Sequence, residues 1–465
     1  MRYQNRTAGR PAPIHRCGGS AGVAPDVVRC APASRFTRRA RIVRRTPAGR
    51  HRSENGCIPL SLSAVAVGKL VIGLGIGQVI SWGTLIYSIA VLGGPMGVDL
   101  EASSTVVFGA FSFSLVVSGA IGPYVGRLID RIGGRPILAW GSFGAAASLL
   151  ALSFASSIGA FFLAWALAGI ARAMTLYEAA FATLSQHTGT SFRNSVSGLT
   201  LLGGLASTVF FPLSLFGLAH VGWRGTLIGF AMAELFICLP LHLACIPARV
   251  ARRHAGAPSG HDEPSQRKPR ASGVFAALSA SFALTAFITS AISVHVVNLL
   301  QSKGLGAASA VFVASLIGPM QLAGRVAELT FGRRWSSIIV GGATLILLVF
   351  ALASLALVHA QVAIAIVFAV AYGCANGIQT IVRGTVPAEL FGRAAYGHMM
   401  GRLAAPSFIA RAIAPIGLTL CVLPQSGIDL SIPLLIGVAV LALLTYVAAV
   451  RGIPRHSSTA EVGDK

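Results

Sequence analysis

Charged residues are scarce in this chain. They make up 11% of its 465 residues and only 14 of them are acidic, whereas 54% of the residues are hydrophobic. Soluble domains carry charges on about a quarter of their residues. The shortage of charge therefore argues against a set of soluble domains and favours a membrane protein.

Several patterns that carry chemistry are missing as well. The seven cysteines contain no CxxC pair, so neither a metal centre nor a disulfide framework is expected. No GxxxxGK[ST] phosphate loop and no HExxH motif occurs, and no nucleophile–base pair stands out. We predict that the chain is not an enzyme, has no catalytic residues and uses no metal or other cofactor.

Long apolar runs fill most of the sequence. Each is long enough to cross the roughly 30 Å hydrocarbon core of a membrane as a helix. Barrel strands would be about half as long and would alternate in polarity, which these runs do not. We therefore predict an all-α membrane protein with twelve transmembrane helices. They lie near 65–92, 104–125, 136–156, 160–184, 196–219, 225–246, 273–299, 307–327, 337–357, 361–382, 397–422 and 430–450.

Polar and basic segments divide the chain. Residues 1–60 hold thirteen arginines against Asp26 and Glu54, which gives +11 of the net charge of +23. This stretch has no apolar periodicity and no signal-peptide core, so we predict a disordered tail; an arm that touches anionic lipid and a misplaced start codon are alternatives. No folded base-reading module accompanies the arginines, so no nucleic-acid partner is expected.

The Pro-, Gly- and Ser-rich stretch 247–272 has the composition of a linker. We predict a six-helix bundle on either side of it. The expected organisation is therefore a tail over 1–60, bundles over 61–246 and 273–451, the linker between them, and a C-terminal tail over 452–465.

Basic residues fix an expected orientation. The loops after even-numbered helices are rich in arginine, whereas those after odd-numbered helices offer only Arg224 and Lys303. Positive loops stay on the cytoplasmic side. Both termini are therefore expected in the cytoplasm, and the lipid bilayer that holds the chain is expected to be a bacterial inner membrane.

The two predicted bundles repeat one sequence weakly. "IGPYVGRLID" at 121–130 returns as "IGPMQLAGRVAE" at 317–328, and in both an acid follows the second glycine by four residues. Chance similarity between two glycine-rich helix ends is the simpler alternative. We interpret the similarity as an internal duplication, which makes Arg325 and Glu328 counterparts of Arg127 and Asp130.

The first copy continues into a recognisable signature. The residues Gly126, Asp130, Arg131, Gly133 and Arg135 resemble the loop 2–3 motif of the major facilitator superfamily, with Gly134 at a position where a basic residue is common. With the predicted helices and the central linker, the resemblance extends over about 65–451. It implies the fold of that family, two pseudo-repeated bundles of six helices.

The chemistry of the motif suits a contact between helices. Gly122 and Gly126 lack side chains and allow a close approach, while Asp130 can accept hydrogen bonds from Arg131 or Arg135 or face the N-terminus of another helix. The resemblance implies that these residues form a conformational clasp between the two halves. A second clasp is expected at Arg325 and Glu328. A loop that only fixes topology is the alternative.

The subfamily is suggested by looser patterns. The motif of drug–proton antiporters is absent from "GGLASTVFFPLSLFG", and the motifs of sugar porters are absent from "CIPARVARR" and "VRGIPRHSS". The stretches "SWGTLIYSIAVL", "LYEAAFATL", "GWRGTL", "YGCANGIQT" and "PAELFGRAAYG" resemble the monocarboxylate and oxalate/formate carriers. This resemblance implies a carrier of small organic anions.

Three charged residues fall deep inside predicted helices. A charge near the membrane centre costs about 2.5–3.5 kcal/mol unless it is paired or hydrated. Arg172 and Arg411 lie at similar depth in different halves, so together they are candidates for binding an anion. Glu178 is the candidate for proton coupling. Structural salt bridges within the bundle are the alternative for these residues.

Further substrate-binding candidates are polar or aromatic residues at helical spacing. Gln78 and Trp82 form an i, i+4 pair with Tyr87 beyond them, and Asn376 and Gln379 form an i, i+3 pair. His295 is the last candidate, although ordinary packing or an interfacial position explains these residues too. Glu234 receives no role.

The predicted function is secondary active transport of a small solute by alternating access. The substrate class is a small organic anion, moved with protons or in exchange for a counter-substrate. The alternatives are a drug or metabolite exporter and a transporter-like membrane sensor without net transport.

Overall fold

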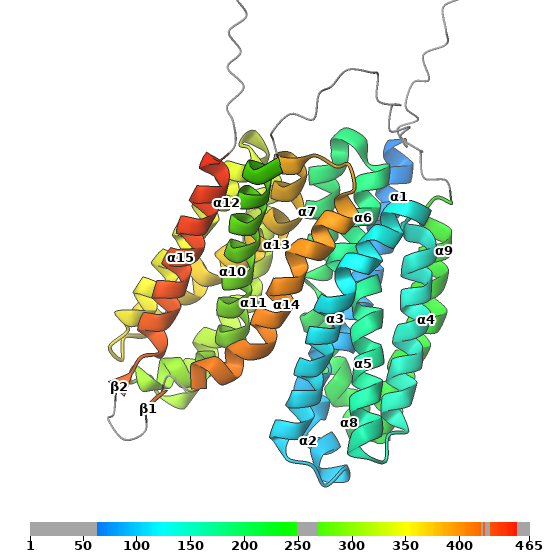
Figure 1. Cartoon of the computed structure of the whole chain (residues 1–465). Helices are drawn as coiled ribbons and strands as arrows, with labels where there is room; N and C mark the ends of the chain where they lie inside the picture. The colour runs from blue at the N-terminus through cyan, green and yellow to red at the C-terminus, as the bar shows by residue number, and fades with distance from the viewer. Residues whose placement is uncertain (1–62, 249–267, 420–421, 424–427, 453–465) are drawn as a thin grey trace, which may run out of the picture. The chain divides into compact units, whose positions relative to one another are not determined.

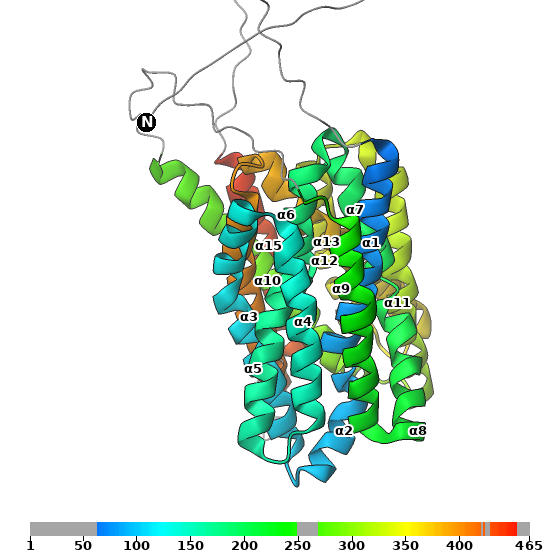
Figure 2. The ribbon, with the colours of Figure 1, turned by 90° about the vertical axis from the view of Figure 1, so that its right-hand side faces the viewer.

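The computed structural model describes residues 63–248, 268–419, 422–423 and 428–452. The tail predicted over 1–60, most of the linker over 247–272 and nearly all of the tail over 452–465 lie outside the described residues. The described chain is almost entirely helical, and its helices run side by side with the connections at their two ends (Figures 1 and 2). The predicted all-α membrane fold class is confirmed.

The helices before the predicted linker are called the N-terminal helices. They are α1 (Ala64–Trp82), the π-helical segment η1 (Gly83–Tyr87), α2 (Ile89–Asp99), α3 (Ser104–Ile132), α4 (Gly134–Ser153), α5 (Ile158–Thr175), α6 (Tyr177–His187), the short η2 (Gly189–Ser191), α7 (Phe192–Gly203), α8 (Ala206–Ala233), the π-helical segment η3 (Glu234–Cys238) and α9 (Leu239–Cys245).

The helices after it are called the C-terminal helices. They are α10 (Lys268–Ser302), α11 (Ala307–Thr330), the short η4 (Gly332–Arg334), α12 (Ser337–Ala356), α13 (Val362–Phe391), α14 (Tyr396–Thr419) and α15 (Ser431–Arg451). Two strands of two residues, β1 (Val422–Leu423) and β2 (Ile428–Asp429), pair antiparallel before α15. This small hairpin was not predicted.

Ten segments of the described chain are long and apolar enough to span a membrane. One of them, Gly189–Cys245, reverses at Gly222, whose φ of 70° breaks the helix where the sequence predicted a boundary between two spans. Glycine tolerates this left-handed backbone at little steric cost. Helix α14, which carries Arg402 and Arg411, is additional to the ten segments.

Four predicted spans are interrupted in the structure, by η1, by the break at Leu176, by the turn between α7 and α8 and by η3, and the first two bear on the site. The first contains the π-helical turn η1, and the span predicted over 160–184 stops at Leu176, whose extended backbone separates α5 from α6. Discontinuous helices and π-helical turns leave backbone groups free to bind other partners, and both are frequent at functional sites. The first two interruptions lie beside the pocket described below.

Close contact between α3 and α14 joins the N-terminal and C-terminal helices. A Cβ atom added to Gly126 would lie 2.0 Å from the Gly397 carbonyl oxygen, and one added to Gly401 would lie 2.3 Å from that of Gly122. These distances leave no room for a side chain at the crossing. The glycines therefore allow the two backbones to meet, as small residues commonly do between membrane helices.

Candidate functional site

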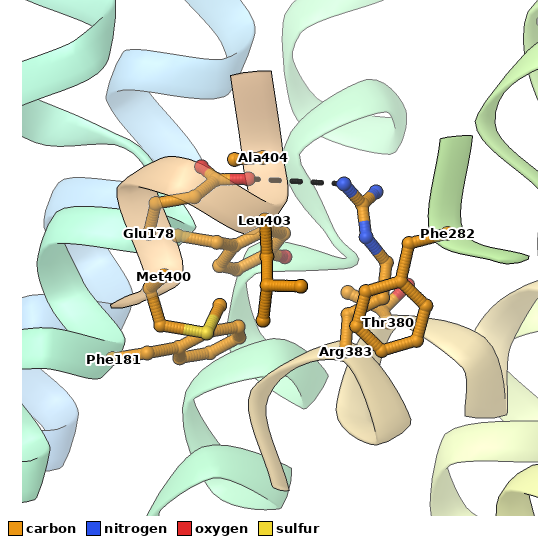
Figure 3. A pocket seen from close by; sticks show the side chains of 9 residues that line it. Glu178, Phe181, Phe282, Thr380, Arg383, Met400, Leu403 and Ala404 are labelled. Carbon is orange, nitrogen blue, oxygen red and sulfur yellow. Dashed lines mark ion pairs between the residues drawn. The ribbon is translucent and has the colours of Figure 1, made fainter. Parts of the chain in front are cut away.

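A pocket lies where α6 faces three of the C-terminal helices (Figure 3). Its wall is mostly apolar and includes two charged side chains. The lining residues are Tyr177, Glu178 and Phe181 of α6, Phe282 of α10, Thr380 and Arg383 of α13, and Met400, Leu403 and Ala404 of α14.

The two charged residues face each other across the pocket. Arg383 Nη2 lies 4.0 Å from Glu178 Oε1, and the side chains are 17% and 21% exposed. Glu178 stands in the first turn of α6, directly after the break at Leu176. The ion pair thus links the N-terminal and C-terminal helices. Because the two charged groups are 4.0 Å apart, another anion could replace Glu178 as the partner of Arg383.

Arg411 adds a second positive charge to this region. Its guanidinium lies 5.8 Å from the ring centroid of Phe408, and its charge interacts with those of Arg383 and Glu178. The side chain has no hydrogen bond in the described part of the protein. The charge of Arg411 also interacts with that of Arg172, so Arg411 lies within electrostatic reach of both arginines.

Arg172 is held inside the N-terminal helices. It is fully buried, its Nη1 donates to Ser114 Oγ at 2.9 Å, and its Nη2 donates to the Leu85 carbonyl oxygen at 2.6 Å. The guanidinium also lies 5.0 Å from the ring centroid of Phe111. The sequence suggested an anion bridged between Arg172 and Arg411. In this conformation Arg172 binds Ser114 and a carbonyl of η1, and its part in an anion site stays a prediction.

We expect Arg172→Ala to lower the thermal stability of the purified protein. The change leaves the buried Leu85 carbonyl without its donor, a loss of about 1–3 kcal/mol. Thermal unfolding in detergent measures the effect, with Arg402→Ala as the control because Arg402 is an exposed arginine. An unchanged melting temperature together with lost transport would instead return Arg172 to the substrate site.

The candidates on the first helix form a polar and aromatic group. Gln78 is fully buried, donates through Nε2 to the Thr175 carbonyl oxygen at 2.6 Å and accepts from Trp82 Nε1 at 3.2 Å. The helix break at Leu176 leaves the Thr175 carbonyl without a helical partner, so the amide replaces the missing bond. Gln78 therefore stabilises the break between α5 and α6.

Aromatic rings connect this group to the pocket. The Trp82 ring centroid lies 5.1 Å from that of Tyr177 and 6.1 Å from that of Tyr87, and Tyr177 stacks on Phe181 at 5.4 Å. Trp82 and Tyr87 thus lie behind the lining residues Tyr177 and Phe181.

The candidates on the C-terminal helices are dispersed. His295 Nε2 lies 3.0 Å from the Pro415 carbonyl oxygen, and Asn376 Oδ1 accepts from Thr289 Oγ1 at 3.3 Å. Gln379 is buried, and neither polar atom of its amide has a partner in the described part of the chain. None of the three lines the pocket, so their role in binding stays a prediction.

Asp130 connects α3 to the start of α14. Its Oδ1 accepts from the Gly397 amide at 2.9 Å, and its Oδ2 accepts from the His398 amide at 2.7 Å. Of the two arrangements that the sequence allowed, the structure has the second, in which the carboxylate faces a helix N-terminus. Arg131 and Arg135 do not bind Asp130, while Gly133 ends α3 with a left-handed φ of 90°.

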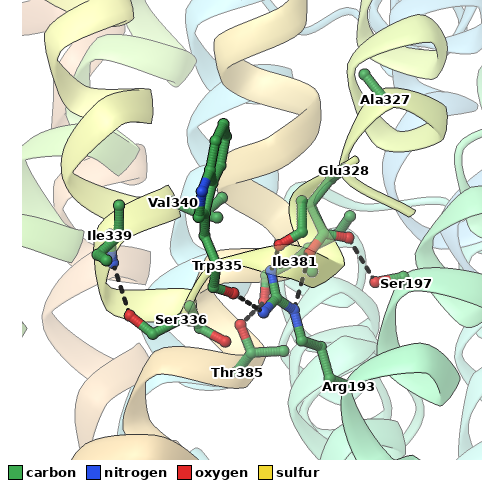
Figure 4. Close-up of polar contacts among 12 residues, drawn as sticks. Arg193, Ser197, Ala327, Glu328, Trp335, Ser336, Ile339, Val340, Ile381 and Thr385 are labelled. Atoms are coloured by element: carbon green, nitrogen blue, oxygen red, sulfur yellow. Dashed lines mark hydrogen bonds and ion pairs between the residues drawn. The ribbon is translucent and has the colours of Figure 1, made fainter. Parts of the chain in front are cut away.

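The second contact is built around Glu328 (Figure 4). Arg193 of α7 donates through Nε and Nη2 to Glu328 Oε1 at 3.0 and 2.8 Å, and Ser197 Oγ donates to Oε2 at 2.7 Å. Arg193 also donates to the carbonyl oxygens of Gly332 and Trp335. Glu328 therefore joins the C-terminal helices to α7.

Arg325 lies away from this contact. Its Nη1 lies against Gly204, its charge interacts with Tyr87 and Tyr177, and its Nε has no partner in the described residues. The partners of Glu328 are therefore Arg193 and Ser197, and Arg325 has other neighbours. We use the name clasp contacts for the bonds of Asp130 and of Glu328.

Two charged residues of these contacts are not evident from the sequence. Arg383 directly follows the span predicted over 361–382, and Arg193 stands among the loop arginines that indicate the orientation. A better signal for Arg193 was available: Glu328 is a buried acid, and such acids need a cationic or hydrogen-bonding partner.

Comparisons with known proteins identify a fold relationship. The family model described as Major Facilitator Superfamily matches residues 71–415. No curated protein matches the chain in sequence. The human organic anion transporter MFSD10 (TETRAN) is similar in structure, with a TM-score of 0.61 and 17% identity over 82% of this chain and 99% of that chain. The MFS proton:xylose symporter XylE, bound to 6-bromo-6-deoxy-D-glucose, is also similar in structure, with a TM-score of 0.64 and 13% identity. The similarity covers 82% of this chain and 95% of that chain.

Proposed function

The chain belongs to the major facilitator superfamily, whose members are transporters, and on this premise we propose that it carries small organic anions across the membrane by alternating access. The proposal places the anion at Arg383 and Arg411, with the coupled proton at Glu178. Exchange for a counter-substrate is the other form of the same cycle. The wider resemblance to the monocarboxylate and oxalate/formate carriers agrees with this substrate class.

The excess of positive charge near the pocket carries the proposal. Arg383 lines the pocket, and Arg411 interacts with it electrostatically, whereas Glu178 is the one acid that lines the pocket in the described part of the chain. Two guanidinium groups at membrane depth are costly unless an anion offsets them. A carboxylate ligand provides both the charge and the acceptor atoms that arginine binds best.

The ion pair between Glu178 and Arg383 suggests how a proton and an anion travel together. When Glu178 is ionised, it holds Arg383 and competes with a substrate carboxylate. When Glu178 takes up a proton, the ion pair is lost and Arg383 can bind the substrate. The pair joins the N-terminal and C-terminal helices, so its opening also alters how the two sets of helices are held together.

We further propose a membrane orientation and a two-bundle organisation. The basic loops support a cytoplasmic location for both termini and for the clasp contacts, in a bacterial inner membrane. The predicted linker over 247–272 would then connect two bundles of six helices. In this orientation the clasp contacts hold the cytoplasmic ends of α3 and α14, and of α7 and α11, together.

Transport is tested with the full chain in two steps. Thermal shifts with lactate, oxalate, choline and xylose at acidic and neutral pH identify the ligand class, and counterflow of the stabilising ligand in proteoliposomes then measures exchange. We expect stabilisation by an anion and accumulation of label. Stabilisation by choline or xylose alone would replace the anion proposal, and binding without counterflow would favour the alternative of a membrane sensor.

We expect Glu178→Gln to uncouple transport from the proton gradient. The amide has no exchangeable charge, so Arg383 stays available at every pH, and anion exchange at equilibrium continues. Uptake of radiolabelled lactate with and without an inward proton gradient measures the effect. The gradient should stimulate the wild type and leave the variant unchanged, and a variant that still responds to the gradient would move the proton to another group.

A further inference from the structure

A second acid lies inside the N-terminal helices, away from the pocket. Glu234 is the first residue of η3 and is 0% exposed. Its Oε1 accepts from Thr84 Oγ1 at 2.9 Å, and its Oε2 accepts from Ser81 Oγ at 3.3 Å. The Cys238 thiol, one turn further along, lies beside the same carboxyl group. Every hydrogen-bond donor to Glu234 is therefore a neutral side chain.

No cation offsets this carboxyl group within the described residues. The segment η3 packs against α1, α4, α8 and α9. The titratable and charged residues of these elements, of η3 itself and of η1, which supplies Thr84, are Lys69, Tyr87, Arg135, His220, Arg224, Cys238, His242 and Cys245. Of these, only Cys238 interacts with Glu234. Arg224 is bound to Asp99 at 2.7 Å, and the His242 ring is bound to Ser142 Oγ at 2.9 Å.

An ionised carboxylate is therefore poorly supported at this position. Burying an unpaired charge costs several kcal/mol, whereas a protonated carboxyl group can donate one hydrogen bond and accept others from the same hydroxyls. Ser81 and Thr84 are suited to this, because a hydroxyl can turn to act as donor or acceptor. The site fits a carboxyl group that binds one proton.

The hydroxyl partners connect Glu234 to the pocket. Thr84 belongs to the π-helical segment η1. The carbonyl oxygen of the next residue, Leu85, accepts a hydrogen bond from Arg172. Tyr87 ends the same segment and packs beside Trp82, whose ring contacts Tyr177 in the pocket wall. A change in the hydrogen bonds of Glu234 therefore acts on a segment that binds Arg172 through its backbone and reaches the pocket wall through its aromatic side chains.

We propose that Glu234 is a proton-binding site separate from Glu178, and that its proton sets the conformation of η1. The protonated form holds Ser81 and Thr84 in the arrangement described here. Loss of the proton leaves an unpaired carboxylate that draws these hydroxyls or water toward itself and displaces η1. The site itself does not depend on the proposed function, and only its effect on transport rests on that proposal.

Infrared spectroscopy of the purified full chain tests the proton directly. We expect the wild type at neutral pH to show a carbonyl stretch of a buried carboxylic acid that Glu234→Gln removes and Thr84→Val shifts, because the latter deletes one hydrogen bond. Glu389→Gln is the control, since Glu389 accepts instead from the Ser337 amide at the start of α12. Thr84→Val keeps the test decisive if the glutamine variant does not fold.

Two spectroscopic results would overturn the proposal. One is a carboxylic-acid band that neither Glu234→Gln nor Thr84→Val alters, which would mean that Glu234 is ionised. The other is a band that sodium removes at constant pH, which would assign the carboxyl group to a metal cation in place of a proton.

Exchange without a gradient tests the effect on η1. Lactate counterflow in Glu178→Gln, in which the pair with Arg383 no longer titrates, should slow as the pH rises and Glu234 loses its proton, whereas the double variant Glu178→Gln/Glu234→Gln should keep the low-pH rate throughout. A double variant that slows as Glu178→Gln does would refute the link to η1. If the wild type exchanges no lactate, the proposed function fails in that assay, while the infrared result still decides the proton site.

Discussion

Alanine in place of Arg383 or of Arg411 is expected to abolish anion transport in a folded protein. Each change removes a guanidinium from the region of the pocket, where Arg383 is also the partner of Glu178. A hydrogen bond to a charged group contributes about 1.5–3 kcal/mol, which corresponds to a factor of about 10–150 in affinity. The loss of both binding and orientation should reduce uptake below detection.

Matched variants make this result specific. Arg402→Ala removes an exposed arginine of α14 and should leave uptake unchanged. Lysine at position 383 or 411 should rescue only part of the activity, because an ammonium group cannot bind a carboxylate through two parallel bonds. Uptake of radiolabelled lactate and equilibrium binding are measured on the same preparations. Transport by both alanine variants at the wild-type rate would refute the anion site.

The sequence predicted the fold class and one contact between helices, because apolar runs and a glycine–aspartate spacing each favour one kind of structure. Apolar runs predicted the fold class because only helices of that length satisfy the backbone inside a membrane. The glycine and aspartate spacing at 126–130 predicted a contact between helices, and the structure places Asp130 at the start of α14. Both predictions depend on local patterns that a single sequence contains.

The pocket was less predictable because its charged residues meet only after the helices pack. Glu178 and Arg383 are far apart in the chain, and no local pattern indicates their pairing. Arg172 was recognised as deeply placed, but its partner is the Leu85 carbonyl, which is available only because α1 continues into a π-helical turn. The residue types around Leu85 do not indicate a π-helical turn, so the sequence does not reveal that its carbonyl is free to bind Arg172.

Glu234 illustrates the same limit in a different way. The sequence assigned it no role, because its partners Ser81 and Thr84 lie 153 and 150 residues away along the chain and meet it only through packing. Small hydroxyl residues in helices also bind the backbone carbonyls of their own helix, so their type alone does not indicate a side-chain partner. The structure was needed to distinguish these two uses.

Asp130→Asn is expected to slow the transport cycle strongly while leaving substrate affinity nearly unchanged. The carboxylate accepts hydrogen bonds from two backbone amides at the N-terminus of α14. A negative charge at this position also interacts favourably with the helix dipole. Asparagine has one acceptor oxygen and no charge, so it loses about 0.5–2 kcal/mol of this contact. Asp130 does not line the pocket that Glu178 and Arg383 line, so binding itself should persist.

The physical reason for a slower cycle is a change in the balance between conformations. The clasp contacts join α3 to α14 and α7 to α11, so they stabilise the conformation in which these ends are held together. A change of one or two kcal/mol alters the ratio of two states by a factor of about 5–30. The protein must pass through both states in every cycle, and depopulating one of them lowers the rate without altering the pocket.

Uptake rate and equilibrium binding of lactate, measured on the same samples, separate these effects. Arg127→Ala is the control, because Arg127 stands near Asp130 on α3 but is exposed, with its guanidinium 4.6 Å from the ring centroid of Tyr124. Arg193→Ala should act like Asp130→Asn, since it removes the cation bound to Glu328. Unchanged uptake in both clasp variants would show that these charges fix the membrane topology and do not control the cycle.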